Sequence, residues 1–222
     1  MSKSRISASA DALLTRRTFS ASRSGAPASS GFISLKRSTV TRGESKLKDA
    51  AEAFSYDFRG KTVLDIGSST GGFSEYALNH GAEKVIAVEK GTRQMKAPLR
   101  FNKRIELHEK TDIFEFKLDE GVKIDTILAD VSFVSLTKVL MYARMNLACG
   151  NTDFLVMLKP QFEAEPRQLN KGVIKNEKMR REIVKKFEAF LKTKRFVVVK
   201  KRDNILAGKN GNVERFYWLK LA

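Results

Sequence analysis

The sequence is poor in the residues that crosslink a chain or hold a metal ion. Among its 222 residues there are one Cys (Cys149), two His (His80 and His108) and four Pro. A single thiol excludes an internal disulfide framework. So few Cys and His ligands exclude a structural zinc site, and we expect no bound metal. Apolar runs such as residues 154–158 are far too short to cross a bilayer, so we expect no membrane insertion.

Positive charge is the feature that the sequence has in excess. Lysine and arginine number 42 against 25 aspartate and glutamate residues, which gives a formal net charge of +17 at pH 7. Such a surplus indicates a polyanionic partner, and nucleic acid and anionic lipid are the common ones. Charge alone does not choose between them and identifies no chemistry, because a basic proteome gives soluble proteins the same surplus.

Residues 1–43 differ in composition from the rest of the chain. They contain eight basic residues, one acid and eleven Ser, and residues 20–30 (SASRSGAPASS) have no spacing that would bury a face. This composition is typical of a flexible segment. It fits a cationic arm that touches RNA, an organelle transit peptide or the remnant of a small RNA-binding domain. We expect a cytoplasmic protein, with a mitochondrion or another organelle as the alternative.

From residue 44 to 222 helices and strands alternate, as in one folded domain. Apolar spacing predicts helices over 46–54, 72–80, 94–101, 133–147 and 177–192. Short apolar runs predict strands over 62–66, 84–88, 105–108, 124–129, 154–158, 196–200 and 213–219. This order predicts an α/β, Rossmann-like methyltransferase fold with a seven-stranded, mostly parallel sheet. The last two strands follow each other without a helix, which predicts an antiparallel last strand.

A glycine-rich turn follows the first predicted strand, at the place where ligands bind in such sheets. Its G-x-x-x-G-G spacing is neither the dinucleotide fingerprint nor a phosphate-binding P-loop. Asp65 suits a cationic ligand group, Glu89 suits a ribose diol, and Asp112 could flank a base ring. These features describe S-adenosylmethionine better than NAD, although the glycines alone would also fit a tight turn without a ligand. The expected cofactor contacts are Asp65, Gly67, Ser68, Ser69, Thr70, Gly71, Gly72, Phe73, Glu89, Asp112 and Asp130.

The residues at the later strand ends indicate which atom receives the methyl group. Residues 129–133 (ADVSF) lack the prolines of amino-nitrogen methylases, and the one Cys is placed at a helix end, unlike the nucleophile of carbon-5 methylases. What remains is Asp130, Lys159 and Glu214, with Lys46 ahead of the first strand. A lysine can take a proton from a ribose hydroxyl if burial or a second cation lowers its pKa. The two acids can orient the two ammonium groups, so no metal is required.

Six stretches of the sequence point to a known family: LDIGSSTGGF (64–73), LHEKTD (107–112), ADVSFVSL (129–136), LKPQFE (158–163), NKGVIKNE (170–177) and KNGNVERFYW (209–218). With them the chain resembles the TlyA family of ribosomal RNA 2′-O-methyltransferases, haemolysin-A-like proteins within the FtsJ-like class. The resemblance implies S-adenosylmethionine as methyl donor and a ribose 2′-hydroxyl of ribosomal RNA, in a cytidine, as target. It implies ribosomal RNA or a ribosomal subunit as partner. It also implies a catalytic tetrad, which falls on Lys46, Asp130, Lys159 and Glu214.

The chain departs from this family in two places. The family usually carries a complete S4-type RNA-binding domain, whereas residues 1–43 hold only a short segment, in which Lys3–Leu14 faintly resembles part of that domain. The residues before Lys46 also differ, so Lys48 competes for its role. The alternative to an active enzyme is therefore an inactive protein that binds RNA or cofactor during ribosome assembly. The cations expected to contact RNA are those of the N-terminal segment, Lys171, Lys175, Arg180 and Arg181.

Overall fold

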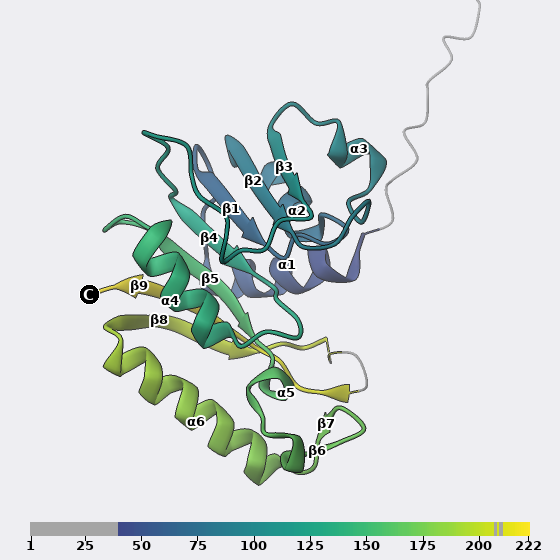
Figure 1. The fold of residues 1–222 in the computed structure, drawn as a ribbon, viewed down its shortest axis with the longest axis vertical. Coiled ribbons are helices and arrows are strands. Elements are labelled where there is room, and N and C mark those ends of the chain that lie inside the picture. Colours follow the sequence, from purple (N-terminus) through teal and green to yellow (C-terminus); the bar gives the residue numbers. More distant parts are fainter. Residues whose placement is uncertain (1–39, 207, 209–210) are drawn as a thin grey trace, which may run out of the picture. The chain divides into compact units, whose positions relative to one another are not determined.

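The computed structural model describes residues 40–206, 208 and 211–222, which Figure 1 traces by element. Helix α1 (Arg42–Phe54) is the first element, and it begins with a capping box. The Thr41 side chain accepts a hydrogen bond from the backbone of Glu44, whose carboxylate accepts one from the backbone of Thr41. With these bonds α1 begins four residues before the helix start predicted at residue 46. It also begins two residues before the predicted start of the folded domain at residue 44. The predictions for residues 1–39 lie outside the described residues.

A seven-stranded sheet confirms the predicted fold, with the strand order β3-β2-β1-β4-β5-β9-β8. The strands are β1 (Thr62–Ile66), β2 (Lys84–Glu89), β3 (Ile105–Glu109), β4 (Thr126–Ala129), β5 (Asp153–Leu158), β8 (Phe196–Asp203) and β9 (Arg215–Leu221). Neighbours from β3 to β5 are parallel, whereas β9 is antiparallel to both β5 and β8. The carboxyl ends of β1, β2, β4 and β5 therefore meet at one edge, where ligands bind in such sheets.

Helices cover both faces of the sheet, because successive residues of a buried strand point to opposite sides. On one face α1 and α2 (Gly72–Asn79) bury residues such as Leu47 and Tyr76. On the other face α4 (Leu136–Asn146) and α6 (Glu177–Thr193) bury residues such as Leu140 and Phe187. Figure 1 shows α4 and α6 together on one side of the sheet. Among the described helices none is long and apolar enough to cross a membrane.

Several predicted elements differ in extent from the structure. Of the helix expected over 94–101 only α3 (Ala97–Arg100) forms, with Pro98 in its first turn. The helix expected from residue 133 begins at Leu136, because Phe133 has a left-handed φ of 64°. The last strand begins at Arg215, so Glu214 lies just outside it. Four short elements between β5 and α6 were not predicted: α5 (Pro160–Glu163), η1 (Pro166–Gln168), β6 (Leu169–Asn170) and β7 (Val173–Ile174).

Candidate active site

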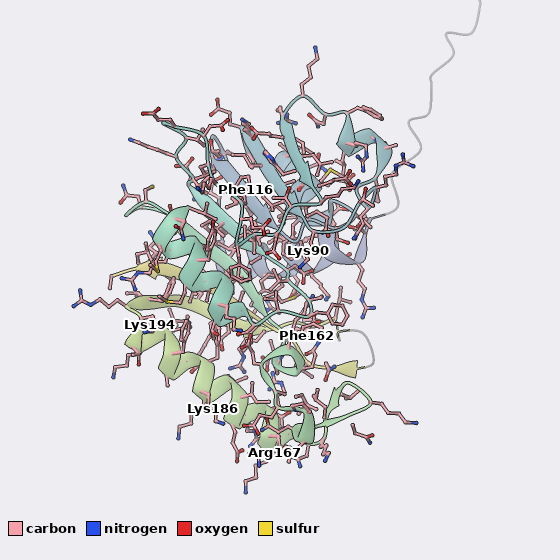
Figure 2. The ribbon with its side chains drawn as sticks, viewed as in Figure 1. Lys90, Phe116, Phe162, Arg167, Lys186 and Lys194 are labelled. Atoms are coloured by element: carbon pink, nitrogen blue, oxygen red, sulfur yellow. The ribbon has the colours of Figure 1, made fainter. Side chains whose placement is uncertain are left out.

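A pocket of about 690 Å³ opens at the carboxyl ends of β1, β2 and β4. Gly67, Glu89, Asp112 and Asp130 line it, and so does Lys90, which Figure 2 labels. Three carboxylates from three different strand ends thus face one cavity, which suits a ligand with hydroxyl and amino groups. Across the described residues, no group of three or more His, Cys, Asp and Glu side chains could hold a metal ion.

Two glycines of the turn after β1 have left-handed backbone angles. Gly67 has a φ of 79° and Gly71 a φ of 88°, which L side chains rarely adopt. A Cβ at Gly67 would lie 3.2 Å from the carbonyl oxygen of Asp130, so this turn passes close to the loop after β4. Gly67 and Ser69 line the pocket. Five other predicted cofactor contacts in this turn are not among its lining residues: Ser68, Thr70, Gly71, Gly72 and Phe73.

Glu89 and Asp112 reach the pocket as carboxylates that neighbouring groups hold in place. Glu89 ends β2 and accepts hydrogen bonds from the backbone N–H of Ser69 at 2.8 Å and of Gly91 at 2.7 Å. Asp112 accepts one from the Lys90 ammonium at 2.9 Å, and this bond lowers the pKa of Asp112. Carboxylate oxygens have lone pairs for further hydrogen bonds. Both side chains can therefore still receive hydroxyl and amino hydrogens of a nucleoside.

Asp65 lies in the core and not on the wall of the pocket. It is fully buried in β1, and the Ser74 hydroxyl of α2 donates a hydrogen bond of 2.6 Å to its carboxylate. Burial raises the pKa of Asp65 to about 7, while the hydrogen bond from Ser74 opposes this shift. Asp65 therefore links β1 to α2. Its contact with the cofactor stays a prediction.

Lys159 and Asp130 form an ion pair at the rim of the pocket. Lys159 follows β5 and Asp130 follows β4, which are parallel neighbours in which Ala129 pairs with Val156. The Lys159 Nζ lies 2.6 Å from Asp130 Oδ1 and donates a hydrogen bond of 2.9 Å to the Ser132 hydroxyl. The two side chains are 11% and 22% exposed, so the pair is largely shielded from water but still open to a ligand.

A second ion pair joins Lys46 and Glu214. The Lys46 ammonium, on α1, contacts the Glu214 carboxylate, and both side chains are buried. Glu214 directly precedes β9, in which Arg215 pairs with Leu158 of β5. Glu214 and Lys159 therefore lie at adjacent ends of β9 and β5, at the same edge of the sheet, where strand axes are about 5 Å apart. The structure brings the four predicted catalytic residues together as two ion pairs, and their roles stay a prediction.

The two candidate lysines of α1 have opposite environments. Lys46 is 8% exposed in its side chain and pairs with the buried Glu214. Lys48 is 57% exposed and lies 3.8 Å from Glu52 on the same helix. A surface pair of this kind contributes little to stability. The structure therefore favours Lys46 over Lys48 as the fourth member of the set.

Two aromatic residues at this edge were not predicted as functional. Phe133 lines the pocket and is 93% exposed, and its ring centre lies 5.1 Å from that of Phe162. The Lys159 Nζ lies 5.9 Å from the centre of the ring of Phe162, a residue of α5 that Figure 2 labels. The sequence holds a signal for both, since Phe133 follows Asp130 by three positions and Phe162 follows Lys159 by three. A large exposed ring beside a pocket is typical of a binding surface.

Comparison with known proteins gives the family. Residues 39–221 match the model of the FtsJ-like methyltransferases. The chain is 38% identical to the 23S rRNA (cytidine-2′-O)-methyltransferase TlyA of Campylobacter jejuni, over 81% of this chain and 70% of the relative. It is 35% identical to the 16S/23S rRNA (cytidine-2′-O)-methyltransferase TlyA of Mycobacterium tuberculosis, over 83% of this chain and 69% of the relative.

Solved structures share the architecture. A candidate hemolysin from Lactococcus lactis is 33% identical and superposes with a TM-score of 0.77, covering 82% of this chain and 88% of that one. A candidate S-adenosylmethionine-dependent methyltransferase from Listeria monocytogenes has a TM-score of 0.61 at 16% identity, over 81% and 98% of the two chains, and shows the fold alone. The sheet, the family match and the relatives together show that this chain belongs to the TlyA family of FtsJ-like methyltransferases.

Proposed function

We propose that this chain transfers a methyl group from S-adenosylmethionine to a ribose 2′-hydroxyl of ribosomal RNA, with cytidine as the expected nucleoside. The Lys159–Asp130 ion pair at the rim of the pocket carries the proposal, because the carboxylate fixes the lysine nitrogen at the place where a bound hydroxyl would meet it. The TlyA relatives are named as rRNA (cytidine-2′-O)-methyltransferases, which supports this substrate. The net charge of +17 supports an RNA partner.

The pocket suits S-adenosylmethionine in its lining and in the shape of its glycine turn. Gly67 has no side chain, and a Cβ added there would lie 3.2 Å from the Asp130 carbonyl oxygen. The turn therefore keeps free the space that a side chain would fill. Glu89, Asp112 and Asp130 all line the pocket. In this proposal Glu89 binds the ribose diol, Asp112 the base and Asp130 the positively charged part. When bound, this cofactor supplies a methyl group on a cationic sulfur. The carboxylates that line the pocket complement that charge.

The residues around the pocket have separate tasks in this proposal. Lys159 Nζ would take the proton of the 2′-hydroxyl as the oxygen bonds to the methyl carbon and the bond from that carbon to sulfur breaks, so that S-adenosylhomocysteine leaves. Asp130 and Ser132 hold Lys159 in place. Lys46 and Glu214 keep a second buried pair beside it. General-base help contributes roughly 10²–10⁴ in rate. Holding oxygen and methyl carbon in line can contribute about 7–11 kcal/mol, so positioning carries more of the rate than proton removal.

Phe133 gives the target nucleotide a surface to stack on. Its exposed ring lies at the pocket wall, three residues from Asp130. Single-stranded RNA bases stack on such rings, and each stacked base is worth about 1–3 kcal/mol. A base stacked on Phe133 would bring its ribose toward the Lys159–Asp130 pair.

The test is methyl transfer from tritiated S-adenosylmethionine to ribosomal RNA and to ribosomal subunits, with the full chain. We expect label in RNA, and mass spectrometry should place it on a ribose and not on a base. Lys159→Ala should slow the appearance of label by about 10²–10⁴, while calorimetry still shows cofactor binding. Cofactor and RNA binding without turnover by the unaltered chain would favour the inactive assembly protein. Locating the tagged full chain in cells tests the cytoplasmic and organellar alternatives.

A further inference from the structure

Helix α6 carries six cations and three carboxylates. Lys178, Arg181, Lys185 and Lys192 are all exposed and follow one another at intervals of three, four and seven residues. Residues at these intervals lie along one stripe of a helix. At 1.5 Å per residue the stripe is roughly 21 Å long. We call these four residues the α6 stripe.

Ion pairs of the fold leave most of this charge uncompensated. Among the ion pairs of the described residues, the α6 stripe contributes one, in which Arg181 lies 3.4 Å from Glu177. Glu182 is the carboxylate beside the stripe, and it lines a shallow surface hollow together with Lys178, Arg181 and Lys185. The stripe therefore presents a net positive row to the solvent.

Arg180 does not belong to this surface, although the sequence suggested it as an RNA contact. It is 7% exposed, and its guanidinium pairs with Glu177 at 3.1 Å and with Asp203 at 2.7 Å. Arg180 therefore anchors α6 to β8. Its neighbour Arg181 lies about 100° further round the helix and is exposed to solvent. Arg180 therefore stabilises the fold, whereas Arg181 is free to contact a ligand.

The stripe begins near the proposed active site. The chain passes from Lys159 through α5 and β7 into α6, and α5 and β7 both contact α6. Figure 1 shows the first turn of α6 beside β6 and β7 and its last turn far from them. Figure 2 labels Lys186 on the same helix, and Lys186 is exposed. An RNA with its target ribose at Lys159 can therefore continue along α6.

We propose that the α6 stripe binds the phosphate backbone of ribosomal RNA beside the methylated nucleotide, an inference that rests on the proposed function. A straight row of cations on a rigid helix complements a row of phosphates. A lipid surface fits less well, because a helix that lies on a membrane turns its apolar face outward. In α6, which is described in full, the large apolar residues face the core, and none is among the exposed ones.

The experiment compares two triple variants of the full chain. Lys178→Gln/Lys185→Gln/Lys192→Gln removes three charges from the stripe. Lys103→Gln/Lys117→Gln/Lys123→Gln removes three exposed lysines before β3 and β4, the same net charge from another region. Filter binding to 16S and 23S rRNA transcripts is measured from 50 to 300 mM KCl. The stripe variant should bind at least about 10-fold more weakly at low salt, with a log–log salt slope reduced by about 2–3, and the control should match the unaltered chain.

Equal affinities and salt slopes for the stripe variant and the unaltered chain would overturn the proposal. Loss of binding to phosphatidylserine vesicles with intact rRNA binding would assign the stripe to lipid and also overturn it. The melting temperature and the cofactor affinity of both variants should match those of the unaltered chain. Binding is measured without turnover, so the two proposals fail separately. An unaltered chain that binds rRNA through the stripe but transfers no methyl group would refute the proposed function alone.

Discussion

Glu163, the last residue of α5, accepts a hydrogen bond of 2.6 Å from the backbone N–H of Leu136, the first residue of α4. It accepts a second bond of 2.6 Å from the Ser135 hydroxyl. The start of a helix needs acceptors for its free N–H groups, and here another element supplies one. Since α5 follows Lys159 and α4 follows the loop from Asp130, Glu163 ties together the two segments that carry this ion pair.

Glu163 is therefore expected to position the Lys159–Asp130 ion pair. Glu163→Ala should lower kcat about 10-fold or more and leave the Kd for S-adenosylmethionine within about twofold, because hydrogen bonds to a charged group are worth about 1.5–3 kcal/mol. Glu163→Gln keeps an acceptor and should recover most of the rate. Rates are measured well below the melting temperature of each variant. A lower melting temperature with unchanged kcat would reduce Glu163 to a structural role.

The Lys159–Asp130 pair should behave as one unit. Lys159→Ala is expected to slow single-turnover methyl transfer by about 10²–10⁴, and Asp130→Ala by less, because Ser132 still holds the amine. With S-adenosylmethionine at saturation, the double variant should be no slower than Lys159→Ala, since residues that act together do not give additive losses. Lys48→Ala, on the exposed side of α1, is the control and should keep full activity. Additive losses in the double variant would contradict a shared role.

The sequence predicts which strand ends meet but not every side chain that acts there. Lys46 and Glu214 are 168 residues apart, and their pairing depends on β9 inserting between β5 and β8. Whether Lys46 or Lys48 turns inward depends on the phase of α1, which its buried Leu47 and Phe54 fix once the helix is packed. Periodicity predicts the long elements because each of them buries a regularly spaced set of apolar residues, as α1 does. It cannot predict the short elements of residues 160–174, whose shape comes from contacts such as those of Glu163.

The buried Asp65 should make stability depend on pH. Its pKa is about 7 in the fold, raised by burial from 3.8, so the folded state favours the protonated form. Its contribution to stability is therefore present below about pH 4 and is lost as the pH rises through 7. Relative to Asp65→Asn, the unaltered chain should lose about 2–4 kcal/mol of unfolding free energy between pH 4 and 8. Urea denaturation of both proteins measures this, and a constant difference would refute the assignment.

Gly67 allows a test of the glycine turn that separates strain from crowding. Gly67→Ala adds a left-handed alanine and a Cβ at 3.2 Å from the Asp130 carbonyl. Gly60→Ala adds the same kind of strain at a φ of 67° with nothing within 4 Å, so it is the matched control. Strain should cost each variant about 1–2 kcal/mol of unfolding free energy, and crowding against Asp130 should make the loss larger for Gly67→Ala. Only Gly67→Ala should weaken cofactor binding, about 10-fold or more by calorimetry. Equal affinities in both variants would show that the turn does not contact the cofactor.

The exposed ring of Phe133 is expected to act on the RNA and not on the cofactor. Phe133→Ala should lower kcat/KM for ribosomal RNA about 10-fold or more, the value of one stacked base, with an unchanged Kd for S-adenosylmethionine. Phe101→Ala removes another exposed ring, 79% accessible in the turn after α3, and should leave both constants unchanged.

Backbone strain at Phe133 gives a second, independent measurement. Because its φ is 64°, Phe133→Gly should raise the unfolding free energy by about 1 kcal/mol while it removes the ring. Phe133→Tyr keeps the ring and should keep the rate. A stabilised Phe133→Gly protein that methylates RNA as fast as the unaltered chain would show that the ring does not stack on the base. A stabilised but slow one would show that the strained, exposed position is maintained for binding RNA.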